Sequence, residues 1–178
     1  MNNIEVEIRC FISLEKYQEL LAFFHREGEF LNEDYQETYY FEAEHDLRIQ
    51  KNNSFSKVVL KSGKVHDYHR KEIEVKFERA EFEKLESLFA TLGYPVAIKW
   101  FRKRHNFKWQ DIDISLDFTK GYGYILELEK MSDEQHQEQN LRFIREKLKL
   151  LQITETFKEE FDQIYKHYLE NWQRLIKE

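Results

Sequence analysis

The sequence predicts an α+β fold in which mainly antiparallel strands close into a barrel and helices pack outside it. Three observations support this prediction. Several stretches alternate polar and apolar residues, which is the period of a strand with one polar and one apolar face. Apolar residues at helical spacing follow these stretches. One strand and helix unit recurs along the 178 residues, a length that fits a single domain over 1–178.

The first strand and helix unit covers the beginning of the chain. Ile4–Cys10 alternates charged and apolar residues, so we expect a strand there. Ser13 is a typical N-cap residue, and apolar residues then recur at helical spacing from Leu14 as far as Gly28. We therefore expect the strand to be followed by an amphipathic helix.

This unit recurs twice. Glu72–Lys76 repeats the Glu-apolar-Glu-apolar-basic order of Glu5–Arg9, and a stretch of helical spacing follows it. Ile125–Lys130 is a third version, and we expect its helix to begin near Ser132 and Asp133. Three expected strands thus share a Glu-x-Glu pattern on one face.

Further strands are expected between these units. They are Leu47–Gln50, Val58–Lys61, Phe101–Arg104 and Asp111–Phe118. The last segment, 156–178, places aromatic and aliphatic residues on one stripe and is expected to form a C-terminal helix. Helices of this kind cover the apolar face of a sheet, so the polar faces need a separate explanation.

Composition and charge exclude several classes of protein. The chain is 35% charged yet 16% aromatic, so it has bulky core material and is not expected to be disordered. Its net charge of −6 argues against nucleic acid or an anionic membrane as a partner. The lone Cys10 cannot form a disulfide within the chain, and no stretch approaches the ~20 apolar residues that span a bilayer. We therefore expect a cytoplasmic protein.

Charged residues lie in phase with the repeated glutamates. The acids are Glu5, Glu7, Glu72, Glu74, Asp117, Glu127 and Glu129, and the bases are Arg9, Arg48, Lys61, Arg70, Arg102 and Arg104. Carboxylates at positions i and i+2 of a strand lie roughly 7 Å apart on the same face. Three such pairs on one sheet repel one another unless cations or a metal lie between them.

Two explanations fit this polar face. A solvated sheet face is the simpler one for any single Glu-x-Glu pair. Three pairs accompanied by arginines favour a functional face, because carboxylates select hard cations such as Mg²⁺ or Mn²⁺ and arginine forks match phosphate oxygens. Inside a closed barrel, the same residues would form a metal and polyphosphate site.

These motifs resemble those of the CYTH superfamily, the triphosphate tunnel metalloenzymes, which include class IV adenylyl cyclases, thiamine triphosphatases and inorganic triphosphatases. The ExExK motif of that family corresponds to Glu5–Arg9. Further matches, in chain order, are Gln36–Phe41 before Leu47–Arg48, the Lys61 strand, Arg70–Glu74, Arg102–Arg104, Leu116–Asp117 and Gly121–Glu129. The resemblance covers about residues 4–165 and implies a closed antiparallel barrel of about eight strands that forms a triphosphate tunnel.

The resemblance also implies roles for the charged residues. Mg²⁺ or Mn²⁺ would be held by Glu5, Glu7, Glu127 and Glu129, with Glu72 and Glu74 as assisting catalytic residues. Phosphates would be bound by Arg9, Arg48, Lys61, Arg70, Arg102 and Arg104. Two positions depart from the family pattern, because Arg9 replaces the usual lysine of ExExK and Gln50 stands where many members have the second arginine of an RxR pair.

Metal-dependent hydrolysis of a triphosphate is the leading hypothesis, with tripolyphosphate, thiamine triphosphate or a nucleoside triphosphate as substrate. One alternative is a class IV adenylyl cyclase that converts ATP into cyclic AMP and pyrophosphate. The other is a domain that binds polyphosphate or nucleotide without turnover. In each case the expected partner is a triphosphate-containing small molecule, and the protein is a monomer or a homodimer.

Overall fold

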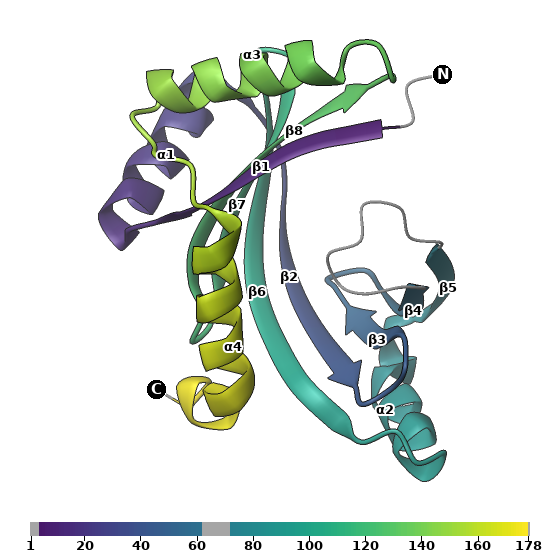
Figure 1. Ribbon diagram of the computed structural model, residues 1–178. Coiled ribbons are helices and arrows are strands. Elements are labelled where there is room, and N and C mark those ends of the chain that lie inside the picture. The colour runs from purple at the N-terminus through teal and green to yellow at the C-terminus, as the bar shows by residue number, and fades with distance from the viewer. Residues whose placement is uncertain (1–3, 62–71, 178) are drawn as a thin grey trace. The chain divides into compact units, whose positions relative to one another are not determined.

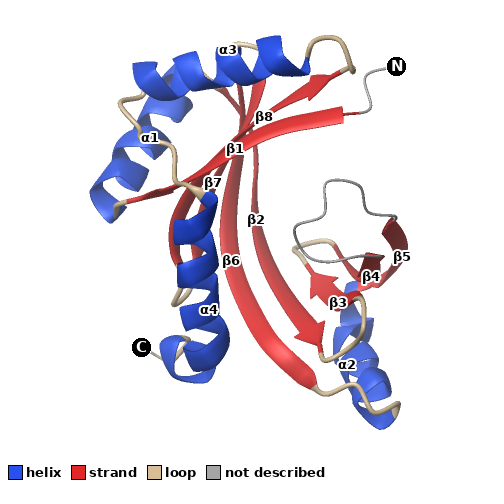
Figure 2. Ribbon diagram, in the orientation of Figure 1, coloured by secondary structure: helices blue, strands red, loops and turns tan. Residues whose placement is uncertain are grey.

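The computed structural model describes residues 4–61 and 72–177. Its strands are β1 (Ile4–Ile12), β2 (Glu29–Phe41), β3 (Asp46–Lys51), β4 (Phe55–Lys61), β5 (Glu72–Glu78), β6 (Val96–Trp109), β7 (Ile112–Thr119) and β8 (Gly123–Ser132). Its helices are α1 (Leu14–Glu27), α2 (Phe82–Thr91), α3 (Gln137–Leu150) and α4 (Lys158–Leu175), with one 3₁₀ turn, η1 (Arg79–Glu81), before α2. Figure 2 distinguishes the two kinds of element.

Hydrogen bonds join the strands into one eight-stranded sheet in the order β1-β8-β7-β6-β2-β3-β4-β5. The pairs β1 with β8, β8 with β7, β2 with β3, β3 with β4, and β4 with β5 are antiparallel. This arrangement confirms the predicted α+β class with an antiparallel sheet of eight strands.

The chain divides into two compact units. The first contains the residues up to Glu33 together with Lys103–His167, and the second contains Asp34–Arg102 and the residues from Tyr168 onward. The long strands β2 and β6, and helix α4, each contribute residues to both units. Each unit has a hydrophobic core of its own.

In the first unit, α1 and α3 pack against the apolar face of β1, β7 and β8 (Figure 1). Buried side chains in this core are Ile8, Cys10, Leu20, Phe24, Leu116, Leu126, Leu128, Ile144 and Leu148. Burial of each large apolar side chain contributes about 1.5–3 kcal/mol relative to its exposed state. Because side chains alternate along a strand, the residues between these core positions project from the opposite face of the sheet.

A buried polar network also attaches α1 to β6 in this unit. The Nδ1 atom of His105 lies 3.0 Å from the hydroxyl of Tyr17, and its Nε2 atom lies 2.9 Å from Oε2 of Glu33. Burial raises the pKa of Tyr17 to about 12, with further contributions from the charges of Asp117 and Glu33. Both ring nitrogens of His105 thus have partners, as a buried imidazole requires.

In the second unit, α2 packs beside β3 and the apolar face of the neighbouring strands (Figure 1). The buried side chains of this core are Tyr39, Phe41, Leu47, Ile49, Phe82 and Leu85. Helix α4 also contacts this unit, because Tyr168 is 1% exposed and donates a hydrogen bond to the carbonyl oxygen of Lys99 at 2.8 Å. Its ring lies 5.0 Å from that of Trp100.

Side-chain hydrogen bonds to the backbone determine where α1 and α3 begin. Oγ of Ser13 accepts a hydrogen bond from the backbone N–H of Lys16 at 3.1 Å, which confirms the N-cap of α1. The expected start of a helix near Ser132 and Asp133 is wrong, since β8 continues to Ser132 and α3 begins at Gln137. Oδ1 of Asp133 instead accepts from the backbone N–H groups two and three residues later, at 3.0 Å each, and forms a turn that separates strand from helix.

Candidate metal and phosphate site

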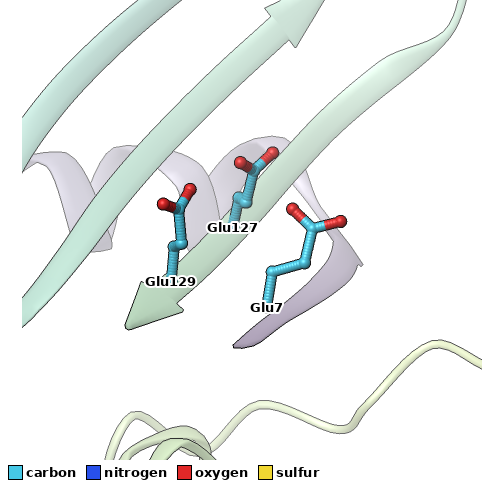
Figure 3. Close-up of side chains that lie close together, drawn as sticks. All are labelled: Glu7, Glu127 and Glu129. Atoms are coloured by element: carbon cyan, nitrogen blue, oxygen red, sulfur yellow. The ribbon is translucent and has the colours of Figure 1, made fainter. Parts of the chain in front are cut away.

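Three glutamates from two neighbouring strands of the first unit lie close together and project to the same side (Figure 3). Glu7 belongs to β1, and Glu127 and Glu129 belong to β8. Each offers a carboxylate oxygen within 4.8 Å of an oxygen of the other two. The strand register sets Glu7 directly opposite Glu129, while the intervening Ile8 and Leu128 are buried on the other face.

These carboxylates form a donor set that suits a hard divalent cation. Oxygens this close repel one another when all three groups are charged, and a cation between them removes that repulsion. Burial raises the pKa of Glu127, and the charges of Glu7 and Asp117 raise it further, although Arg104 acts in the opposite direction. Mg²⁺ and Mn²⁺ are the ions whose preference for oxygen ligands fits this cluster.

Arg104 of β6 is held beside this cluster by Asp117 of β7. Its Nε and Nη2 atoms donate to the two carboxylate oxygens of Asp117 at 2.7 Å each, and Nη2 also donates to Glu127 at 3.3 Å. Asp117 is 2% exposed. Burial lowers the pKa of Arg104, but the hydrogen bonds to Asp117 and the charges of Asp117 and Glu127 raise it. The net effect is a raised pKa. The guanidinium therefore stays charged and fixed in orientation.

Arg9 provides a second, more exposed cation on β1. Its Nη2 atom lies 3.1 Å from Oε1 of Glu7, and its side chain is 54% exposed. An ion pair of this kind contributes about 0–1 kcal/mol, so it holds the guanidinium only loosely. Arg9 can therefore turn toward an anion, whereas Arg104 is already aligned.

In the second unit, Arg48 of β3 lies opposite Tyr40 of β2. Its Nη1 atom donates to the Tyr40 hydroxyl at 2.8 Å, and the guanidinium carbon lies 5.3 Å from the centre of the Tyr40 ring. Asp46 lies 3.8 Å from Nε of Arg48. The neutral phenol thus orients Arg48 without neutralising its positive charge. An oriented guanidinium of this kind suits phosphate binding.

Glu74 of β5 pairs with lysines rather than with other carboxylates. Its Oε2 atom accepts from Nζ of Lys57 at 2.6 Å, and Lys76 lies 3.6 Å away. The hydrogen bond from Lys57, together with the charges of both lysines, lowers the pKa of Glu74. Lys61 of β4 lies opposite Asp46 of β3 in the strand register.

The predicted site residues therefore fall into two groups within the described structure. Glu7, Glu127, Glu129, Arg9 and Arg104 gather in the first unit, and Arg48, Lys61, Glu74 and Arg102 belong to the second. Arg70 lies outside the described residues. Glu5 and Glu72 belong to β1 and β5, but their side chains also lie outside the described part of the structure.

The polar contacts include residues that the sequence did not single out. Tyr40 orients Arg48, and Lys57 pairs with Glu74. Tyr40 lies within Gln36–Phe41, one of the segments that match the family pattern. The sequence therefore indicated this segment but did not predict that Tyr40 orients Arg48. Recognition of either partner requires knowing which strands pair and in what register.

Comparisons with known proteins identify the family of this chain. The family model described as the CYTH domain matches residues 3–165. A protein of Methanocaldococcus jannaschii named "Putative adenylate cyclase MJ0240" is 31% identical over 163 residues, which are 85% of this chain and 91% of that protein.

Among the helices that the structure describes, none is both long enough and apolar enough to cross a membrane.

Solved structures show the same fold. A conserved hypothetical protein of Pyrococcus furiosus is 28% identical, with a TM-score of 0.66 over 88% of this chain and 93% of that one. A Hippeastrum protein named "Putative adenylyl cyclase" and described as having a dominant triphosphatase activity is 17% identical, with a TM-score of 0.67 over 92% of this chain and 95% of that one. The barrel-like tunnel fold predicted from the sequence is the fold of these proteins. The chain belongs to the CYTH family.

Proposed function

We propose that this protein is a metal-dependent enzyme that hydrolyses a triphosphate. The observation that supports this most strongly is the convergence of Glu7, Glu127 and Glu129 beside the half-buried guanidinium of Arg104, which Asp117 fixes in orientation. Three carboxylates that each offer an oxygen within 4.8 Å of the others repel one another unless a cation lies between them. Membership of the CYTH family supports the same function.

In this proposal Glu7, Glu127 and Glu129, together with Glu5, hold Mg²⁺ or Mn²⁺. The bound metal supplies charge that polarises phosphate oxygens and offsets the charge developed in the transition state. Arg104 presents its guanidinium in a fixed direction, and Arg9 adds a mobile one. Phosphoryl transfer is catalysed mainly by such positioning and by electrostatic stabilisation.

The remaining assignments belong to the same proposal. Arg48, Lys61, Arg70 and Arg102 bind phosphate oxygens, and Glu72 and Glu74 act on the attacking water. The orientation of Arg48 by Tyr40 supports its assignment. The protein acts in the cytoplasm on a small triphosphate-containing molecule, as a monomer or a homodimer.

Adenylyl cyclase activity is the second candidate, and the name of the relative that is 31% identical favours it. The two reactions differ in which phosphorus is attacked. Hydrolysis uses water at a terminal phosphate, whereas cyclisation uses the ribose hydroxyl of ATP at the α-phosphate and releases pyrophosphate. Both reactions require the same cationic side chains that bind the triphosphate and the same carboxylates that bind the metal.

One experiment separates these functions. The purified protein is incubated with tripolyphosphate, thiamine triphosphate or ATP, each with Mg²⁺, Mn²⁺ or a chelator, and the products are identified as phosphate, pyrophosphate or cyclic AMP. We expect metal-dependent release of phosphate. Cyclic AMP with pyrophosphate would establish the cyclase instead, and stoichiometric binding without product would establish a binding domain. A failure to bind any of the three would overturn the proposal.

A further inference from the structure

Gln50 lies two residues from Arg48 on the same face of β3. Across the strand pair, Gln50 lies opposite Thr38, just as Arg48 lies opposite Tyr40. Side chains at i and i+2 of a strand are roughly 7 Å apart. A ligand whose phosphate is bound by Arg48 therefore has Gln50 as a neighbour along the strand.

A carboxylate fixes the orientation of the Gln50 amide through a chain of hydrogen bonds. Oδ2 of Asp34 accepts from Nε2 of Gln36 at 3.0 Å, and Oδ1 of Asp34 accepts from the backbone N–H of Asn53 at 3.0 Å. Because a carboxylate only accepts, Gln36 must turn its NH₂ group toward Asp34 and its oxygen the other way. That oxygen then accepts from Nε2 of Gln50 at 3.4 Å.

Both N–H bonds of Gln50 are used in this way. Its Nε2 atom also donates to Oγ1 of Thr38 at 3.1 Å, and Thr38 is 6% exposed. No residue in the described ranges 4–61 and 72–177 donates a hydrogen bond to Oε1 of Gln50. Because both donors of the amide are bound by side chains of β2, the half-buried Gln50 holds its acceptor oxygen in a fixed orientation.

An acceptor oxygen at this position disfavours phosphate. The unprotonated oxygens of a triphosphate are acceptors too, so they repel Oε1, whereas an amino or hydroxyl group donates to it. An arginine here would instead present a fork to phosphate. A site that hydrogen-bonds a polar group of its substrate discriminates against an analogue that lacks the group, since its own polar atom is then left unpaired.

We infer that Gln50 is a specificity-determining residue that selects a triphosphate bearing an organic group with a hydrogen-bond donor, such as an amino or hydroxyl group, over inorganic tripolyphosphate. This inference rests on the proposed function and narrows its substrate class. Arg48 binds phosphate, and Gln50 pairs with the donor of the attached group. The chain from Asp34 through Gln36 keeps the Gln50 oxygen in the acceptor orientation.

The test is an equilibrium measurement on the full chain with Mg²⁺. Isothermal titration compares the analogues of ATP and of tripolyphosphate in which a methylene group, which is not a hydrogen-bond donor, replaces a bridging oxygen. We expect the wild type to bind the ATP analogue at least tenfold more tightly. Gln50→Leu should weaken that binding about tenfold, because one substrate hydrogen bond is lost. It should not weaken binding of the tripolyphosphate analogue, since leucine removes the acceptor oxygen that repels phosphate. Gln50→Arg should tighten binding of the tripolyphosphate analogue.

Three controls keep the outcomes distinct. Gln36→Leu leaves Gln50 in place but frees its amide to rotate, so it should reduce the discrimination partially. Gln50→Met, unbranched and similar in length, replaces Gln50→Leu if thermal melting shows that the leucine variant does not fold. Glu134→Gln, at an exposed residue, should change neither affinity.

Equal affinity of the wild type for both analogues would overturn the inference alone. So would equal weakening of both by Gln50→Leu, because Gln50 would then only connect β2 and β3. If the wild type bound neither analogue, nor any of the three natural triphosphates, the proposed function itself would fail.

Discussion

The polar faces of the two units use the same strand alternation to build opposite chemistry. In the first unit, carboxylates converge and the nearby guanidinium of Arg104 is already bound by Asp117. In the second, Arg48 is oriented by a phenol, and its neighbour Gln50 is neutral. The difference teaches that alternation decides which face is polar, while the partner on the adjacent strand decides whether that face attracts a cation or an anion.

The largest expected effect tests the cation-binding side of this comparison. Glu127→Gln combined with Glu129→Gln should lower triphosphate turnover by about a thousandfold, equivalent to about 4 kcal/mol, because amides keep the shape of the side chains but not their charge. In metal-free buffer the variant should melt no lower than the wild type, since repulsion among the carboxylates is removed. Phosphate release and thermal melting measure the two effects. Glu134→Gln is the matched control, and undiminished turnover of tripolyphosphate would contradict the metal assignment.

The next effect concerns stability and contrasts a buried ion pair with a more accessible one. Asp117→Ala should lower the free energy of unfolding by about 3 kcal/mol, because the half-buried charge of Arg104 then keeps only its 3.3 Å contact with Glu127. Glu74→Ala should cost less than about 1 kcal/mol, because its pair with Lys57 is partly solvated, with side chains 28% and 22% exposed. Urea denaturation measures both. Equal losses would show that the two polar faces do not differ in burial.

A smaller effect tests the phase of β6, which contributes to both units. Arg102→Ala and Arg104→Ala should each weaken triphosphate binding about tenfold, whereas Lys103→Ala should change it less than twofold. Lys103 is 45% exposed and pairs with Glu33 at 3.2 Å. The losses should depend on the number of phosphates and not on the organic group. If Lys103→Ala proved the most damaging, the strand phase would be shifted by one residue.

The smallest expected effect is the pH dependence of the stability that the ionised Glu74 side chain contributes. Because its folded pKa is lowered, chiefly by the hydrogen bond from Lys57, the ionised carboxylate contributes stability above the pKa that Glu74 has in the unfolded chain. That contribution is lost as the pH falls through the folded pKa. Glu74→Gln should therefore melt slightly below the wild type at pH 7, and the difference should shrink in more acidic buffer. A constant difference across this pH range would exclude the ion pair as its cause.

Much of the fold could be predicted locally. The alternation of Ile4–Cys10 and the N-cap at Ser13 correspond to β1 and α1, because strand period and helix capping depend on neighbouring residues alone. Two features were less accessible. The first part of β2, Glu29–Glu33, is exposed throughout, so no alternation of polar and apolar residues indicates a strand there. The turn formed by Asp133 delays the start of α3.

For the site, the sequence by itself determined which residues carry the chemistry, namely the repeated glutamates and the arginines in phase with them. Only the tertiary structure decided which of them meet. The pairing of β1 with β8 brings Glu7 to Glu129, which lies far along the chain, and the neighbouring β6 and β7 bring Asp117 to Arg104. Long-range strand order and register arise from cooperative hydrogen bonding and core packing between distant segments, so no local pattern specifies them.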